Sequence, residues 1–273
     1  MQTIDASGTG FNGVVRRWSP WTIDDDGGEL VVRDLRIAGV VNAKAIEILL
    51  TNTARVPGRT LCFARVVVRN VEVRDVRRDE MGRRAGLHLD HLRIAGGGNG
   101  QPRETEVIIE DFAAIGGNVP PLIVQDGRFS RIVLRRVRVE NVEVDGHPGS
   151  WHKVQVAAIN TGHVREVVVD QSPGLRVALM GRPGSIGTCI VRASPEASVS
   201  DELTKNGRSG VSIRVEDEAA GAPPAAGAPP AATAPPAAGA TGAAAEALED
   251  REVVIAGRRM RLVDVPAAVP PRG

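Results

Sequence analysis

Short runs of β-branched residues recur between Leu30 and Asp201, and each run is broken by a polar or turn-forming residue. Such residues are stiff at the first side-chain torsion and pack well on a pleated surface, so the runs predict strands rather than helices. Six segments carry the pattern, with equivalent positions separated by 22 to 41 residues. The equivalent positions are Val32, Val67, Ile108, Val133, Val168 and Ile190. This self-similarity predicts a repeat architecture in which each unit packs on its neighbours.

A second series of short apolar segments lies between the first ones. Each repeat is therefore expected to hold at least two or three strands. Helical periodicity is almost absent before residue 218, which leaves sandwiches, barrels and solenoids as candidates. Sandwiches and barrels favour clean alternation and tight Asn-Gly hairpins, so the repeats favour a solenoid. The second series consists of ILLTNT from Ile48, LHLDHL from Leu87, LIVQDG from Leu122, AAINTG from Ala157 and VALMGR from Val177.

The segments VVVRNVEVRDV, from Val66, and IVLRRVRVENVEVDG, from Ile132, resemble the coils of right-handed parallel β-helices. That fold occurs in pectate lyases, polygalacturonases and many phage spikes. The resemblance implies an all-β protein, a right-handed parallel β-helix (solenoid) of about six coils. In this family an Asn or Asp often occupies the tight corner between two strands, and Asp34, Asn70 and Asn141 fit that place. Such a corner needs a positive φ, which Asn and Asp tolerate best after Gly.

Four segments are expected along the chain. Residues 1–29 form an amino-terminal cap or attachment segment, because Phe11, Trp18 and Trp21 can cover the open end of a solenoid. Residues 30–218 form the β-helix. Residues 219–247 are a Pro/Ala-rich linker that favours polyproline II and cannot form a core. Residues 248–273 form a docking element and tail, with a small C-terminal β-hairpin in which two apolar runs flank Ala-Gly.

Composition excludes several classes of protein. Lys plus Arg is 34 against 33 Asp plus Glu, a net charge of +1, so the chain has no global field for nucleic acid. No apolar run reaches the roughly 18 residues of a membrane helix, so no membrane insertion is expected, and no secretory signal is recognisable. Cys62 and Cys189 are 127 positions apart and are predicted to be core thiols. Neither a metal nor a cofactor is expected.

The second series also supplies candidate catalytic residues. Aligning its segments places five polar residues in neighbouring columns and predicts one polar patch near the strand ends. Asp90, Asp126 and His91 are the catalytic candidates, either as an acid/base couple for glycoside hydrolysis or as carboxylates holding Ca²⁺ in a lyase. Gln125 and Asn160 complete the patch as ligand-binding residues. The alternative is a structural ladder that satisfies backbone groups at the corners.

Two loops and one face add binding candidates. The segment HPGSWHK contains Trp151 and His152 and is expected to form a loop whose Trp stacks on a sugar or covers the local core. A second loop runs from Gly96 to Glu104. His88 and Asp90 are predicted on one strand face and His91 on the other, which disfavours a shared metal. Arginine alternates with Val in the strands, so Arg and Glu columns are expected to pair on the outside.

The resemblance, the absent signal and the long tether together predict a structural or adhesion subunit, a spike or fibre, of a phage-like particle. Its expected partners are host surface polysaccharide and other structural proteins of the particle. It is expected to be a homotrimer, made in the cytoplasm and located in the virion. One alternative is a polysaccharide lyase or glycoside hydrolase. The other is a cytoplasmic polymerising scaffold resembling bactofilins.

Overall fold

The computed structural model describes residues 28–50, 62–97, 100–101, 103–144 and 149–216, with the backbone of five short strands outside these ranges. The chain divides into two units, Met1–Asp217 and Glu218–Gly273. The capping side chains predicted in residues 1–29 and the predicted linker 219–247 lie outside the described residues. In the second unit, β18 (Glu252–Ile255) and β19 (Arg258–Arg261) pair antiparallel, as the hairpin prediction requires.

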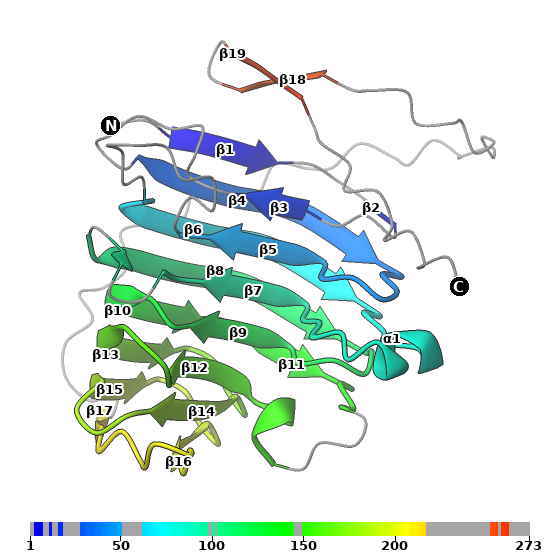
Figure 1. Cartoon of the computed structure of the whole chain (residues 1–273). Coiled ribbons are helices and arrows are strands. Elements are labelled where there is room, and N and C mark those ends of the chain that lie inside the picture. Colours follow the sequence, from blue (N-terminus) through cyan, green and yellow to red (C-terminus); the bar gives the residue numbers. More distant parts are fainter. Residues whose placement is uncertain are drawn as a thin grey trace, which may run out of the picture. The chain divides into compact units, whose positions relative to one another are not determined.

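The first unit is built from two sheets of parallel strands (Figure 1). The path through the ten-stranded sheet is β1 (Thr3–Ser7), β4 (Glu29–Ala38), β6 (Arg65–Arg74), β8 (Thr105–Ile115), β10 (Arg128–Arg135), β13 (His163–Asp170), β15 (Ile186–Arg192) and β17 (Ser212–Glu216), with β2 (Phe11–Asn12) and β11 (Arg138–Glu140) beside β4 and β8. The seven-stranded sheet holds β3 (Arg16–Trp18), β5 (Ile46–Leu49), β7 (Leu92–Ala95), β9 (Leu122–Gln125), β12 (Val154–Ala158), β14 (Arg176–Gly181) and β16 (Ser198–Glu202).

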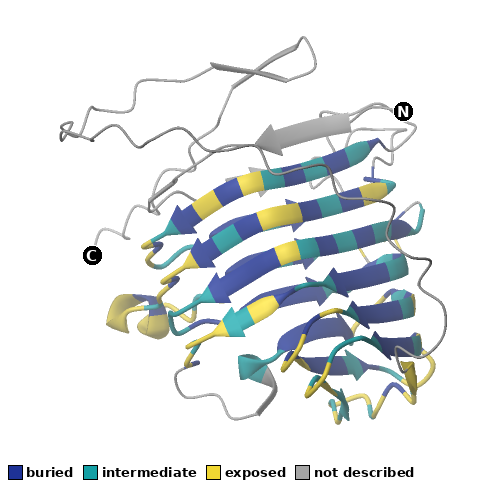
Figure 2. Cartoon of the chain, turned by 180° about the vertical axis from the view of Figure 1, so that it is seen from behind, coloured by how far each residue is buried: buried dark blue, intermediate teal, exposed yellow. Residues whose placement is uncertain are grey.

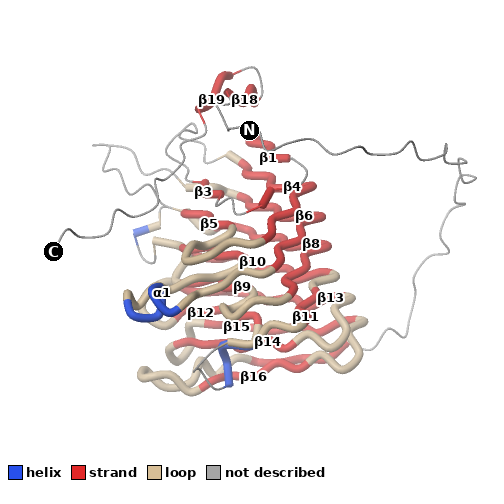
Figure 3. Tube along the Cα trace, turned by 90° about the vertical axis from the view of Figure 1, so that its right-hand side faces the viewer, coloured by secondary structure: helices blue, strands red, loops and turns tan. Residues whose placement is uncertain are grey.

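From β4 to β17 the chain alternates between the two sheets, apart from β11, which follows β10 in the same sheet. Seen from the side, the strands of each sheet lie one above another, with loops joining the two stacks (Figure 3). The α-helix α1 (Glu80–Arg84) is the only one among the described residues, and η3 (Gly149–His152) is a single 3₁₀ turn. The prediction of an all-β fold is therefore confirmed, with parallel pairing throughout both sheets.

The core is a set of inward columns that run through successive strands. One column is wholly buried and in strict register from β4 to β15, and the buried positions alternate with more exposed ones along β4 and β6 (Figure 2). The predicted equivalence of positions is confirmed from Val67 onward, but Val67 pairs with Val31 and not with Val32. The inward column consists of Leu30, Val66, Val107, Ile132, Val167 and Cys189.

On the outer face of the ten-stranded sheet, charges of opposite sign alternate from strand to strand. Arg65 Nη2 lies 2.7 Å from Glu106 Oε2, and Arg131 Nε lies 2.7 Å from Glu166 Oε2. The pairing predicted for outward Arg and Glu columns is confirmed. We call this column the charge ladder, and it consists of Glu29, Arg65, Glu106, Arg131 and Glu166.

Candidate functional site

A hollow of about 510 Å³ lies over the bend where the strands of the ten-stranded sheet turn a corner. The bend follows from backbone conformation, because one residue at the same place in successive repeats has a positive φ. We call the hollow the corner groove. Leu35, Val71 and Phe112 lie at its base, and polar side chains surround them. The positive-φ residues of the corner are Asp34, Asn70, Asp111, Arg136, Gln171 and Ala193.

The predicted corner positions are confirmed in conformation. Asp34, Asn70 and Asn141 all have φ between 51° and 53°, although Asn141 lies five residues beyond Arg136, at a second corner. Asn70 Nδ2 donates to Asp34 Oδ1 at 2.6 Å, so the side chains of adjacent corners also bond. Asn and Asp adopt this backbone region more readily than other residues with a Cβ, which explains why these side chains occupy the turns.

One column of residues that lines the groove contains a small residue among long ones. Arg36, Glu72, Ala113 and Arg138 are register partners on adjacent strands, on the outer side just after the corner. Ala113 has the shortest side chain of the four, and it lines the hollow together with the other three.

Arg136 organises the charge on one wall of the groove. Its Nε donates to Asp111 Oδ1 at 2.6 Å and its Nη1 donates to Gln171 Oε1 at 3.1 Å, across neighbouring strands. The hydrogen bond from Arg136 lowers the pKa of the Asp111 carboxyl. The hydrogen bond from Arg74 likewise lowers the pKa of Glu72. Both carboxylates are therefore charged at neutral pH and act as hydrogen-bond acceptors beside arginine donors.

The structure divides the predicted polar patch, because the alignment on which it rested is out of register. Gln125, Asp126 and Asn160 lie together, whereas Asp90 and His91 do not join them. Leu92 pairs with Leu122 and Ala95 with Gln125, so Asp90 precedes its strand while Asp126 follows its own. These two carboxylates therefore lie at opposite ends of two adjacent strands and cannot form an acid/base couple. Leu89 is buried in the loop before β7, so the alternation in LHLDHL reflects a buried loop.

The pair Asp126 and Asn160 forms a structural ladder, and Gln125 lies beside it. Asp126 has φ of 48°, and its Oδ1 and Oδ2 accept from the backbone N–H and Nδ2 of Asn160 at 3.1 and 2.9 Å. Gln125 is half-buried at the end of β9, and its carbonyl oxygen accepts from the backbone N–H of Gly96 at 2.9 Å. This arrangement matches the alternative interpretation, in which corner side chains satisfy backbone groups.

Asp90 and His91 are both wholly buried. The His91 ring fits between two carbonyl oxygens, with Nδ1 3.1 Å from Pro120 and Nε2 2.9 Å from Gly116. Burial lowers the pKa of His91. Neither carboxylate oxygen of Asp90 has a hydrogen-bond partner among the described residues, and His88 Nδ1 is 3.7 Å from its Oδ2. Neither residue reaches the corner groove.

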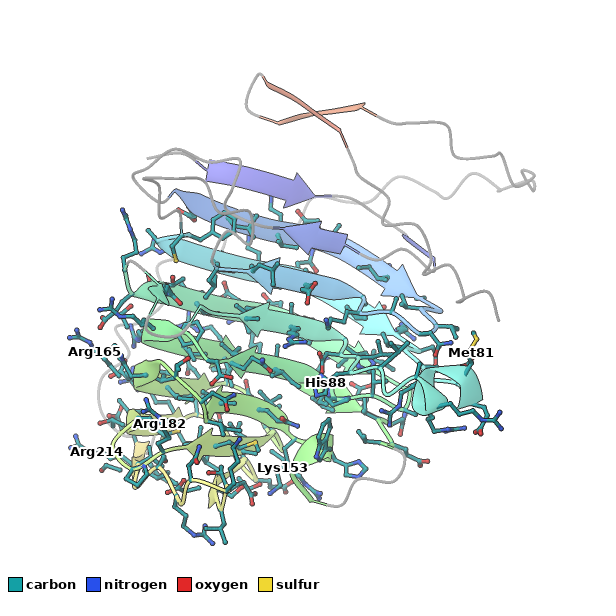
Figure 4. The ribbon with its side chains drawn as sticks, in the orientation of Figure 1. Met81, His88, Lys153, Arg165, Arg182 and Arg214 are labelled. Atoms are coloured by element: carbon teal, nitrogen blue, oxygen red, sulfur yellow. The ribbon has the colours of Figure 1, made fainter. Side chains whose placement is uncertain are left out.

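The structure places Trp151 beside His88, with ring centroids 5.2 Å apart at 59°. Figure 4 shows His88 near the 3₁₀ turn η3, away from the outward-pointing Arg165 and Arg214. His152 Nδ1 accepts from the backbone N–H of Val144 at 3.3 Å. Trp151 and His152 are both half-buried, so these two side chains pack against the body of the first unit. The contact joins two segments that sequence reasoning treated separately.

Sequence reasoning missed the corner groove, although it identified the corner. The available signal was the column that follows the positive-φ residue, where Ala113 interrupts Arg36, Glu72 and Arg138.

No family model, curated protein or solved structure matches the chain. Among the described residues, no helix is long and apolar enough to cross a membrane, and no group of three His, Cys, Asp or Glu could hold a metal ion.

Proposed function

We propose that the first unit winds as a right-handed parallel β-helix and that the protein is a spike or fibre subunit which binds a surface polysaccharide along the corner groove. Alternation between two parallel sheets, with positive-φ corners in register, supports the winding. In this proposal the subunit is a homotrimer of a phage-like particle, where it meets the other structural proteins and is located in the virion.

The corner groove is the observation that carries the proposal. Its polar wall draws on four successive repeats from Asn70 to Gln171, and neighbouring strands lie about 4.8 Å apart, so the groove runs along the stack for roughly 15 Å. A linear polymer fits such a track better than a compact ligand does. Arginine donors stand beside carboxylate and amide acceptors, the combination that sugar hydroxyls need.

The chemistry of the groove favours binding over cleavage. A glycoside hydrolase needs a carboxylic acid that is protonated near neutral pH, so its pKa has to be raised. The two carboxylates that line the groove, Glu72 and Asp111, have lowered pKa values. Arg74 and Arg136 keep these carboxylates ionised. An ionised carboxylate can accept hydrogen bonds from a ligand but cannot act as a general acid.

Filling the groove tests the proposal. Ala113→Arg places a long side chain in the space between Glu72 and Arg138, while Thr188→Arg adds the same side chain to the outer side of β15, away from the groove. We expect the full chain to bind at least one of a panel of neutral and acidic bacterial surface polysaccharides. Ala113→Arg should weaken that binding at least about tenfold, and Thr188→Arg should not.

The same experiment separates the alternatives. Equal binding by the two variants would remove the groove from the proposal, and no binding to any polysaccharide would overturn adhesion as the function. New reducing ends or unsaturated products on incubation would favour the hydrolase or lyase instead. Circular dichroism of both variants checks that the fold is retained.

A further inference from the structure

The strand β17 ends the ten-stranded sheet with one unpaired edge. It pairs with β15 on one side and has no strand on the other among the described residues. Ile213 and Val215 are the register partners of the buried Cys189 and Val191, so they continue inward columns of the core. They are nevertheless 41% and 72% exposed. Within the part of the chain that the structure describes, the core therefore reaches the end of the stack with these two apolar side chains exposed.

The strand β16, which ends the seven-stranded sheet, is protected by the segment that follows it. Asp201 accepts hydrogen bonds from the backbone N–H groups of Ser209 and Gly210, at 3.0 and 2.9 Å. Arg208 donates to the carbonyl oxygen of Asp201. Natural edge strands are blunted in such ways, or by Pro, a bulge or an inward charge. The described β17 has no Pro, and its inward residues are apolar.

We infer that β17 is a self-association surface at which two copies of the chain pair edge to edge and antiparallel, about a two-fold axis through Val215. Val215 of one copy then lies opposite Val215 of the other, and the two unfinished cores meet end to end. The unpaired backbone groups of each strand supply the hydrogen bonds. The inference does not depend on the groove or on its ligand.

Charge complementarity selects this partner and this register. The outward residues Arg214 and Glu216 flank Val215 in the sequence. A two-fold axis through Val215 places Arg214 of each copy opposite Glu216 of the other. Each Glu216 carboxylate, which already accepts from Arg192 Nε at 2.5 Å, then meets a second guanidinium. An axis through Arg214 would instead oppose two arginines, which is unfavourable. Figure 4 shows Arg214 at the end of the stack, pointing outward.

A cysteine at the axis tests the pairing directly. Directly opposed Cβ atoms in an antiparallel pair lie about 4.5–5.5 Å apart, near the range that a disulfide spans. We expect full-length Val215→Cys to form a disulfide-linked dimer on mild oxidation with diamide, seen on a non-reducing gel. Leu203→Cys is the matched control, because Leu203 is 70% exposed at the same end of the stack but off the axis. The native Cys62 and Cys189 are buried and should not contribute.

Sedimentation supplies a measurement that needs no cross-link. The wild-type full chain should have twice the mass of the Val215→Lys variant, whether that variant is a monomer or the homotrimer proposed above. Arg214→Glu should raise the dissociation constant at least about tenfold, because the symmetry repeats each repulsion. Equal masses would overturn the inference and favour the chain's own carboxyl-terminal segment as the cover. Filaments, or equal cross-linking of the two cysteine variants, would also overturn it.

Discussion

His91 shows how a polar side chain becomes part of a β-rich core. A neutral imidazole carries one N–H, yet the ring nitrogens of His91 face the carbonyl oxygens of Pro120 and Gly116. Only the cation could donate to both. Burial opposes the charge more strongly than these contacts favour it, so the pKa is lowered and the ring is neutral at pH 7.

This lowered pKa makes folding stability depend on pH. Below about pH 6.5 the unfolded chain takes up a proton at His91 that the folded chain resists, so stability falls as the pH drops from about 6.5 toward the folded pKa. We expect urea denaturation to give a lower free energy of unfolding at pH 5 than at pH 7.5. His91→Gln should reduce this difference because it removes the titrating group.

His152→Gln provides the comparison, because His152 is only half-buried and accepts one hydrogen bond. The free energy of unfolding should depend on pH less strongly in His91→Gln than in His152→Gln. Carboxylates titrate mainly below about pH 5, so the chosen interval reports chiefly on histidines. If the free energy of unfolding of His91→Gln depended on pH as strongly as that of the wild type, burial of this ring would not govern the loss of stability at low pH.

At the scale of the element, the charge ladder stabilises the outer face through alternation. Glu106 lies between Arg65 and Arg131 on the neighbouring strands. Glu106→Lys would place three cations on consecutive strands and should lower the free energy of unfolding by about 1–2 kcal/mol at low salt. Added salt should recover part of the loss, because the charges are partly exposed.

Glu106→Gln separates repulsion from simple loss of the ion pair. It should cost less than Glu106→Lys, and its stability should depend less on salt. If thermal or urea denaturation ranked the two variants equally at low ionic strength, alternation of charge would have no energetic role in the sheet.

The sequence predicted the elements of the ten-stranded sheet better than those of the seven-stranded sheet. Strict columns of β-branched residues identify β6 to β15, and the one slip, Val32 for Val31, arises because Leu30, Val31 and Val32 are all apolar. In the other sheet the strands are shorter and a buried loop precedes β7. Apolar alternation cannot separate such a loop from a strand, so the predicted site around Asp90 was misplaced.

At the scale of the whole molecule, a stack of repeats makes local stability depend on position. Each repeat contacts only its neighbours, so a terminal repeat can open without the rest. Cys62 precedes β6, whereas Cys189 lies in β15, one strand from the exposed β17. The two thiols therefore report on different parts of the stack.

Both thiols should be protected from Ellman's reagent in the native state at pH 8. Burial raises the pKa of Cys62 to about 11 and that of Cys189 to about 12, so little thiolate is present at pH 8. Burial also keeps the reagent from reaching either sulfur atom. We expect Cys189 to react at a lower urea concentration than Cys62. Reaction of Cys189 is measured in the Cys62→Ala variant, and reaction of Cys62 is measured in the Cys189→Ala variant. Simultaneous reaction would instead indicate that the whole stack unfolds as one unit.

The same labelling connects stability with association at the β17 edge. If a second copy covers this edge, it also shields the repeat that contains Cys189. Val215→Lys should then move the reaction of Cys189 to lower urea and leave that of Cys62 unchanged, because Cys62 is several strands away. If Val215→Lys lowered the urea concentration of reaction equally for both thiols, Val215 would affect the stack as a whole. Protection of Cys189 could then not be assigned to pairing at the edge.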